Sequence, residues 1–351
     1  MPEESVWARY PQELPAPFDS NYSFSKLQVM DGCLARGGVV RELANMFRTT
    51  NEYALLGQVV HRYVEQLALK PGQDVSLWDA VCEQVYQEAR ATAIADPPRP
   101  EKWAGYQVKR IAAEKRLVSH ETGLIHQEKT DIPWHHEVQL VHPSEPYFGI
   151  LDLLRYGAND TIEILDLKTG PTQTPPSLNH SRQLGFYGYI AEAALGKKVS
   201  QLGILSAGGS QHLVENVSET IRDSLSWASG VRKLYEKSKE SWSLLFSEAK
   251  PSVENCRGCE LRPKCTSYLQ DSKLHRATGF VSGFVSAAGV AANRSAWAEV
   301  STDATGSLVH ISGLPMAPEL GTTVAVMEGR YSSDNSIKVE WNSRLAVISS
   351  A

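Results

Sequence analysis

The chain has 351 residues, of which 42% are hydrophobic and 21% are charged. These proportions are typical of a globular protein with room for two or three domains. The formal net charge of -5 excludes an overall basic field that would attract nucleic acid, although a local basic patch is compatible with it. No apolar run reaches the roughly eighteen residues of a transmembrane helix, so we expect no membrane span.

Residues 1–21 are interpreted as a lead-in that precedes the first domain. This segment is acidic and interrupted by proline. It lacks the basic segment and the apolar stretch of a secretory signal, so we expect a cytoplasmic protein.

Helical spacing dominates from Tyr22 to about Arg90. Within "LLGQVVHRYVEQLAL", apolar residues recur every three or four positions and predict an amphipathic helix that contains His61. A further helix is predicted over 101–118, after a proline-rich break. It carries basic residues with aromatic residues among them, namely Lys109, Arg110, Lys115, Arg116, Trp103 and Tyr106. A solvated helix face is the ordinary interpretation of such a run.

Three strand-like segments follow, "WHHEVQLVH", "YFGILDLLRY" and "TIEILDLKTG". Alternate residues of a strand point to one face, so Asp166 and Lys168 emerge together at the end of an otherwise apolar strand. They could form a simple surface ion pair. However, Asp152 interrupts the apolar run before it, and burying a carboxylate there costs several kcal/mol unless a partner or a metal compensates.

The segments of Asp152 and Asp166 are separated only by the turn "GAND", so we expect them to pair as a hairpin. Two carboxylates on adjacent strands form a hard, oxygen-rich site suited to Mg²⁺ or Mn²⁺. Lys168 beside them could hold an attacking water or stabilise charge that develops on a phosphate.

The remaining chain continues with a helix over 182–196, a strand, and one long amphipathic helix over 217–247. From about Thr278 the composition shifts to Gly, Ser and Val in short alternating runs. We expect these runs to form a small antiparallel, OB-like β-barrel over 276–351.

The order of these motifs resembles the PD-(D/E)XK nuclease superfamily, and more specifically its RecB-type branch. That branch has a histidine on an upstream helix, then G-x-x-D, D-x-K-T-G and a helix with Q-L-x-x-Y. The matching residues are His61, Gly149, Asp152, Asp166, Lys168, Thr169, Gly170, Gln183, Leu184 and Tyr187. The resemblance implies an α/β fold with a restriction-endonuclease-like core, a mixed sheet flanked by helices. The nuclease domain would span 22–275 with a helical insertion at about 34–130.

The resemblance also implies a role for each matched residue. The metal would be held by His61, Asp152, Asp166 and the backbone carbonyl of Leu167. Lys168 would orient or activate water, while Gln183 and Tyr187 would border the active site and touch the substrate.

Such a site would give possible roles to Glu137 and to the basic helix over 101–118. Glu137, on the preceding strand, is where the family often has another acid. It would contact the metal through water or be only a strand-edge charge. The basic helix over 101–118 would follow the phosphates of a nucleic acid, with Trp103 or Tyr106 stacking on bases.

Three of the five cysteines crowd into "CRGCELRPKC". A tetrahedral zinc site or a 4Fe–4S cluster needs a fourth ligand, Cys33 or Cys82. Cys82 lies on an apolar helical stripe and is interpreted as a small buried hydrophobe. AddB-type nuclease domains and CRISPR-associated exonucleases carry one N-terminal cysteine and a similar C-terminal trio. That resemblance implies an iron–sulfur cluster on Cys33, Cys256, Cys259 and Cys265, and the spacing alone leaves zinc open.

The resulting prediction is a Mg²⁺- or Mn²⁺-dependent deoxyribonuclease with a structural 4Fe–4S cluster. By analogy with the family, it would be an exonuclease on single-stranded or end-bearing DNA, with a helicase or another protein as a partner in repair or phage defence. Two alternatives remain open. One is a catalytically weak DNA-binding or scaffold subunit, and the other is a zinc-stapled RNA-binding protein.

Overall fold

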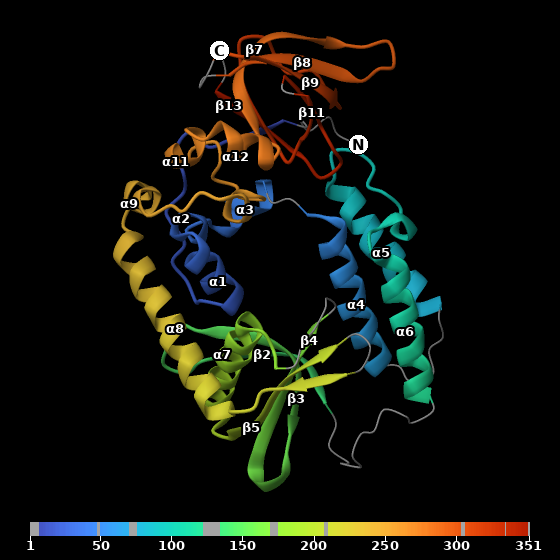
Figure 1. Ribbon diagram of the computed structural model, residues 1–351, viewed down its shortest axis with the longest axis vertical. Coiled ribbons are helices and arrows are strands. Elements are labelled where there is room, and N and C mark those ends of the chain that lie inside the picture. The colour runs from blue at the N-terminus through green and yellow to red at the C-terminus, as the bar shows by residue number, and fades with distance from the viewer. Residues whose placement is uncertain are drawn as a thin grey trace.

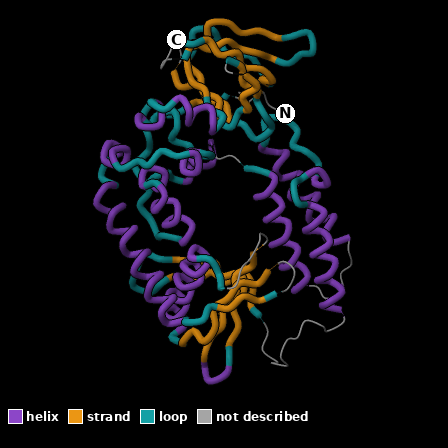
Figure 2. The backbone as a smooth tube through the Cα atoms, in the orientation of Figure 1, coloured by secondary structure: helices purple, strands orange, loops and turns teal. Residues whose placement is uncertain are grey.

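The computed structural model describes most of the chain, namely residues 7–47, 50–69, 76–121, 134–168, 175–206, 210–302, 306–333 and 335–349. Thr169 and Gly170 of the predicted motif lie outside the described residues, as do the side chains of Lys115 and Arg116. Every helix in the described ranges is too short or too polar to span a membrane. Strands gather at two opposite ends of the molecule, and helices connect these ends along two sides (Figure 1, Figure 2).

A mixed five-stranded sheet forms one of these ends, with strand order β2-β3-β4-β5-β6. Its strands are His135–Val141, Phe148–Tyr156, Thr161–Lys168, Lys198–Ser206 and Gln211–Leu213. β4 and β5 run parallel, and the other neighbours are antiparallel. β3 and β4 form the predicted hairpin through the turn η2 (Ala158–Asp160), in which Asn159 and Asp160 have φ angles of 57° and 61°. The expected mixed sheet flanked by helices is confirmed.

Two helices, α7 (Leu178–Leu195) and α8 (Val217–Ser238), cover one face of this sheet (Figure 1). α7 connects the parallel strands β4 and β5. Gly185 lets α7 approach α8 closely, because a Cβ at this position would collide with Ser224. The core between sheet and helices contains fully buried apolar side chains, among them Ile164, Leu184, Ile190 and Leu202.

The expectation of one continuous helix over 217–247 is wrong. α8 ends at Ser238, and α9 (Trp242–Ser247) begins separately. Between them Ser241 has an extended backbone with φ −152°, and its side chain accepts a hydrogen bond from Leu244 N–H. A serine in this conformation caps a new helix and interrupts the previous one.

Three helices form a second layer beside the sheet: α4 (Glu52–Leu69), α5 (Ser76–Thr92) and α6 (Tyr106–Glu121). They bury a core of their own, to which Leu165 and Leu167 of β4 contribute. β4 therefore separates two cores, because Ile164 belongs to the core under α7. The shorter elements before and within this layer are α1 (Phe24–Gly32), α2 (Leu34–Gly37), α3 (Arg41–Phe47) and η1 (Pro100–Lys102).

A β-domain forms the other end of the molecule, and its eight-stranded sheet has the order β1-β13-β10-β7-β8-β9-β12-β11. The strands are β1 (Ala8–Arg9), β7 (Val281–Val290), β8 (Ala296–Ser301), β9 (Leu308–Leu314), β10 (Thr323–Met327), β11 (Arg330–Ser333), β12 (Ser336–Lys338) and β13 (Arg344–Ser349). β1 comes from the N-terminal lead-in and pairs in parallel with β13. Within the described residues no ladder joins β1 to β11, so the expected closed OB-like barrel is not found. The two-residue β1 takes the edge position beside β13 and leaves the sheet open there.

The cysteine-rich segment connects the two ends of the molecule through α10 (Val253–Cys256), α11 (Thr266–Leu269) and α12 (Ser272–Ala277). Its Arg262 side chain is 1% exposed, and Nη1 lies 2.9 Å from Oε1 of Glu328 in the β-domain. The same carboxylate oxygen accepts the Gly258 N–H at 2.7 Å. A buried ion pair therefore fixes the β-domain to the cysteine segment.

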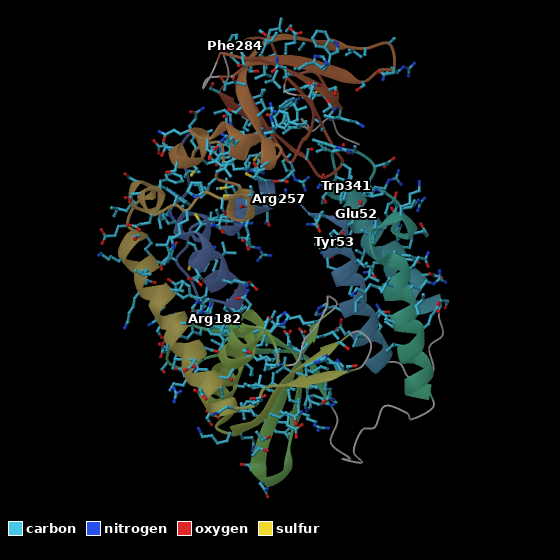
Figure 3. All side chains as sticks on the ribbon, in the orientation of Figure 1. Glu52, Tyr53, Arg182, Arg257, Phe284 and Trp341 are labelled. Atoms are coloured by element: carbon cyan, nitrogen blue, oxygen red, sulfur yellow. The ribbon has the colours of Figure 1, made fainter. Side chains whose placement is uncertain are left out.

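The β-domain also contacts the helical layer. The Asn342 side chain donates a hydrogen bond to the carbonyl of Thr50 at 3.3 Å, and Trp341 packs against the core of α4, α5 and α6. Figure 3 shows Trp341 above the start of α4, where Glu52 and Tyr53 lie. The β-domain is thus attached at two separate places.

We predict that Glu328→Gln destabilises the protein by about 3 kcal/mol, because it removes the carboxylate that pairs with the buried Arg262 guanidinium. Urea unfolding followed by circular dichroism measures the change in the free energy of unfolding. The control is Asp96→Asn, which removes the partner of Arg90 in an exposed ion pair and should leave the free energy of unfolding nearly unchanged, because solvent screens the pair. Equal losses in the two variants would contradict the structural role of the buried pair.

Candidate active site

Two carboxylates stand at the end of the β3–β4 hairpin. Leu153 pairs with Leu165, so Asp152 and Asp166 occupy the next facing positions on the same side of the sheet. Oδ2 of Asp152 accepts the backbone N–H of Leu167 at 2.7 Å. Asp166 is only 3% exposed. The register of the hairpin therefore brings the two acids together in a largely buried place.

Glu137 reaches the same place from β2. Its neighbours His136 and Val138 both pair with β3, so Glu137 lies opposite Asp152. The φ angle of Glu137 is 49°, in the left-handed region that non-glycine residues rarely adopt. Such a conformation costs on the order of 1 kcal/mol and is concentrated at functional sites.

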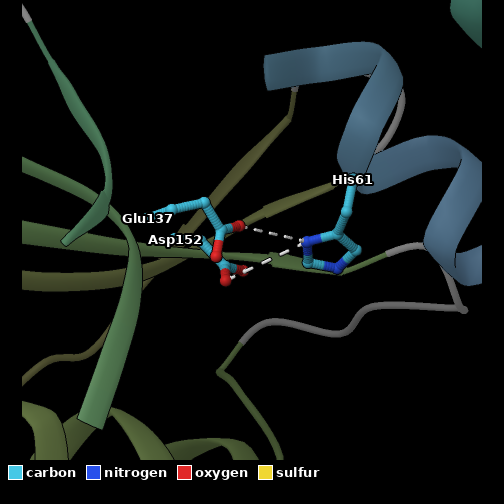
Figure 4. A group of neighbouring side chains, drawn as sticks. All are labelled: His61, Glu137 and Asp152. Carbon is cyan, nitrogen blue, oxygen red and sulfur yellow. Dashed lines mark ion pairs between the residues drawn. The ribbon is translucent and has the colours of Figure 1, made fainter. Parts of the chain in front are cut away.

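His61 approaches these carboxylates from α4. Its Nδ1 lies 4.0 Å from Oε1 of Glu137 and 4.0 Å from Oδ1 of Asp152. Figure 4 shows the imidazole directed at both acids. The helical layer thus supplies one side chain to a site that is otherwise built on the sheet.

Lys168 is fixed between the buried acid and α7. Its Nζ lies 2.7 Å from Oδ2 of Asp166 and donates a hydrogen bond to Oε1 of Gln183 at 2.8 Å. The Gln183 amide donates in turn to the Tyr187 hydroxyl at 3.2 Å. Gln183 and Tyr187 are one turn apart on α7, so this helix holds the ammonium in place.

Gly149 of the G-x-x-D motif has a steric reason to be glycine. A Cβ at this position would lie 2.9 Å from the ring of Tyr187. The glycine therefore leaves room for Tyr187, the last residue of the hydrogen-bonded series that runs from Lys168 through Gln183. The sequence pattern predicted the motif, but this contact between β3 and α7 was not part of the prediction.

Burial and repulsion perturb the ionisation of the site. Burial, and then the charge of Asp166, raise the pKa of Asp152 to about 7. Burial lowers the pKa of His61, which favours a neutral imidazole. Oδ2 of Asp166 is buried and has no hydrogen-bond partner, because its contact with Lys168 lacks hydrogen-bond geometry.

These features fit a divalent cation. Carboxylate oxygens are suitable ligands for Mg²⁺ or Mn²⁺, and a neutral imidazole is a ligand of transition-metal ions. In the described part of the chain, His61, Glu137 and Asp152 bring three ligand atoms within 4.8 Å of one another. A cation there would also relieve the repulsion between Asp152 and Asp166. The resemblance implied His61, Asp152 and Asp166 as direct metal ligands. In the structure, Glu137 lies in the group with His61 and Asp152, and Asp166 contacts Lys168.

The aromatic residues of the basic helix correct one expectation. Trp103 and Tyr106 are 2% and 3% exposed, and they pack in the core of the helical layer. Trp103 donates to the carbonyl of Pro98 at 2.8 Å. Both rings are therefore unavailable for stacking on bases. The expected start of this helix at 101 is also wrong, because α6 begins at Tyr106 and Trp103 follows the short helix η1 instead. Helical spacing did not show that the two side chains point inward.

The basic residues of the same helix have local roles. Arg110 lies 3.5 Å from Asp79 and 3.3 Å from Glu114, so its charge is compensated within the layer. Burial lowers the pKa of Lys109. These contacts support the interpretation of this helix as an ordinary solvated surface more than its interpretation as a surface that binds nucleic-acid phosphates.

The other predicted cofactor site is a small cavity that four cysteines share. Cys33, Cys256, Cys259 and Cys265 are all buried and line a cavity of about 20 Å³ together with Arg36 and Arg262. Burial raises the pKa of the thiols of Cys256, Cys259 and Cys265. Nη2 of Arg262 is buried beside them without a hydrogen-bond partner. Cys82 packs elsewhere, in the core of the helical layer.

Comparisons with known proteins agree with this geometry. A comparison with protein-family models matches residues 21–266 to the PD-(D/E)XK nuclease superfamily. A comparison with curated proteins found no match. The matched region covers most of the chain and includes the sheet, α4 and α7. The chain therefore belongs to the PD-(D/E)XK nuclease superfamily.

Proposed function

We propose that this protein is a divalent-metal-dependent deoxyribonuclease that hydrolyses phosphodiester bonds. The convergence of His61, Glu137 and Asp152 beside the buried Asp166–Lys168 pair carries the proposal. Membership of the superfamily supports a nucleic acid as the substrate.

The chain offers ligands for the cation on four elements, α4, β2, β3 and β4. His61, Asp152 and Asp166 would hold it together with the carbonyl of Leu167, and Glu137 would contact it directly or through water. When bound, the cation would act as a Lewis acid on the scissile phosphate. Because the imidazole comes from α4, docking of the helical layer on the sheet would complete the ligand set.

Lys168 would provide the second positive charge. Its ammonium is fixed by Asp166 and Gln183, at 2.7 Å and 2.8 Å. From this position it would hold the attacking water or stabilise charge on the phosphate oxygens. Gln183 and Tyr187 would orient the ammonium and border the substrate.

The RecB-type resemblance supports a narrower activity. We propose exonucleolytic cleavage of single-stranded or end-bearing DNA, with a helicase or another protein as a partner. The presence of Asp152, Asp166 and Lys168 together supports an enzyme over a DNA-binding subunit without catalysis.

We expect Asp166→Asn and Lys168→Met each to lower cleavage of end-labelled DNA by at least about a hundredfold with Mn²⁺, because the first removes a proposed ligand of the cation and the second removes a positive charge near the reacting phosphate. Cleavage rates on single-stranded and duplex substrates provide the measurement. The matched controls are Asp160→Asn and Lys198→Met, at positions where the side chains are 78% and 84% exposed. These controls should cut at wild-type rates. If the wild type cuts no faster than the site variants on either substrate, the binding-subunit alternative is favoured.

Metal binding should depend on pH through Asp152. Its pKa rises from 3.8 to about 7 in the folded protein. Between these values the metal-free folded protein holds a proton that the unfolded chain releases, so its stability falls as pH rises. A cation needs the carboxylate, so its affinity should increase up to tenfold per pH unit below about pH 7 and level off above it.

Calorimetric titration with Mn²⁺ in buffers of different ionisation enthalpy measures this proton release. Below about pH 7, binding should release up to one proton, and Asp152→Asn should abolish the release. Asp160→Asn is the control and should behave as wild type. A pH-independent affinity for Mn²⁺ would contradict the assignment of Asp152 as a ligand.

We also propose that Cys33, Cys256, Cys259 and Cys265 hold a 4Fe–4S cluster that ties the start of the nuclease domain to its end. The four thiols line one small cavity, which supports a shared metal centre, and the resemblance supports an iron–sulfur cluster over zinc. Arg36 and Arg262 would offset the negative charge of the thiolates.

Protein purified without oxygen should be brown, with broad visible absorption and with iron and sulfide in equal amounts. Cys33→Ser should remove the colour and the iron. Cys82→Ser is the matched control, because this buried thiol lies outside the cavity, and it should retain both. Colourless wild-type protein that contains zinc would contradict the iron–sulfur proposal and leave the nuclease proposal untouched.

A further inference from the structure

A histidine in the first turn of α7 lies beside the candidate active site and has no role in the proposed catalysis. His180 precedes Gln183 by three residues and Tyr187 by seven. Residues at these spacings lie on one face of a helix. Gln183 accepts a hydrogen bond from Lys168 Nζ on that face, at 2.8 Å. His180 therefore extends the row of Gln183 and Tyr187 by one turn toward the start of α7.

The charged pair at the end of β4 acts on the imidazole of His180. Burial lowers the pKa of His180, the ammonium of Lys168 lowers it further, and the carboxylate of Asp166 acts in the opposite direction. The residues that join β4 to α7, 169–177, include no charged side chain, so they add no competing charge. These effects favour a neutral imidazole near pH 7.

The two ring nitrogens of His180 have different surroundings. Nδ1 is buried and has no hydrogen-bond partner. The residue as a whole is partly exposed, so Nε2 is the nitrogen that a ligand can reach. A proton on Nδ1 would be buried without an acceptor, which is costly, so the neutral ring keeps its proton on Nε2. His180 thus presents an uncharged N–H donor beside Gln183.

We propose that His180 is a further substrate-binding residue, which donates a hydrogen bond from Nε2 to an oxygen of the phosphate next to the scissile one. Lys168 would serve the scissile phosphate, and His180, one turn along the same face of α7, would serve its neighbour. An uncharged donor suits this place, because a second cation would repel the ammonium of Lys168. The choice of a DNA phosphate as the ligand rests on the proposed nuclease function.

The test measures binding of a fluorescein-labelled oligothymidylate of about twenty nucleotides by anisotropy, with excess chelator to prevent cleavage. His180→Ala should weaken binding about tenfold, because one hydrogen bond to a charged group is lost. The amide nitrogen of glutamine reaches the position of Nε2, whereas that of asparagine reaches only the position of Nδ1. His180→Gln should therefore bind within about twofold of the wild type, and His180→Asn should bind as weakly as His180→Ala.

Three further measurements test the kind of contact. Loss of an uncharged donor should leave the slope of log affinity against log salt unchanged, whereas loss of a cation would lower it by about one. A phosphate contact carries no sequence information, so His180→Ala should lose the same factor on oligodeoxyadenylate. In cleavage with Mn²⁺, His180→Ala should raise KM about tenfold and leave kcat within about threefold, because the contact exists before and during the reaction. A lowered salt slope or a base-dependent loss would overturn the assignment.

Asn179→Ala is the matched control. Asn179 is exposed and neighbours His180 in the same turn, so its side chain lies outside the row that contains Gln183. This control should bind within about twofold of the wild type. Because Nδ1 makes no hydrogen bond, the His180 variants should keep nearly the thermal stability of the wild type, which thermal unfolding measures. Normal binding by His180→Ala, or equal losses in His180→Ala and Asn179→Ala, would overturn the proposal.

The outcome is separable from that of the catalytic proposal. A wild-type protein that cuts DNA while His180→Ala binds and cuts normally would overturn only the phosphate contact. A wild-type protein that binds but does not cut, with the expected pattern among the variants, would overturn only the catalytic assignment. A wild-type protein that binds neither oligonucleotide and does not cut would overturn both.

Discussion

The burial of carboxylates at the end of the β3–β4 hairpin is the constraint that organises the rest of the site. A buried carboxylate is costly unless an opposite charge or a hydrogen bond compensates it. Here Lys168 compensates Asp166, and the backbone N–H of Leu167 compensates part of Asp152. The compensation is incomplete at Asp152, whose pKa is raised to about 7 by burial and by the charge of Asp166. The two neighbouring carboxylates therefore repel each other, and an added cation would reduce that repulsion.

β4 links these carboxylates to the architecture. Its alternate residues face two different cores, with Leu165 and Leu167 in the helical layer and Ile164 under α7. Asp166 and Lys168 continue the face that points to α7, where Gln183 receives the ammonium. One strand thus anchors the helical layer, which carries the imidazole, and also presents the charged pair. Apolar packing on both sides fixes the geometry of the polar groups between them.

Local patterns predicted those parts of the site that depend on neighbours in sequence. The hairpin and the shared face of the D-x-K pair follow from the strand period of two, whereas the roles of Gln183 and Tyr187 were implied only by the resemblance to the RecB-type branch. The left-handed conformation of Glu137 and the contact of Gly149 with Tyr187 depend on tertiary packing, which these periods do not encode. The same limit explains the buried rings of Trp103 and Tyr106, and the pair that joins Arg262 to Glu328. The arrangement of the β-domain sheet was not predicted, because β1 joins it from a segment that is distant in sequence.

The parallel pairing of β1 with β13 has a consequence for how the protein assembles during synthesis. Ala8 is aligned with Ala346, so nearly the whole polypeptide separates these partners. Contacts of such long sequence separation form slowly, because the loop between them has to be ordered first. During synthesis β1 cannot pair until β13 has emerged from the ribosome, while the helical layer can already fold from contiguous segments. The β1–β13 edge of the β-domain can therefore form only after β13 has been synthesised.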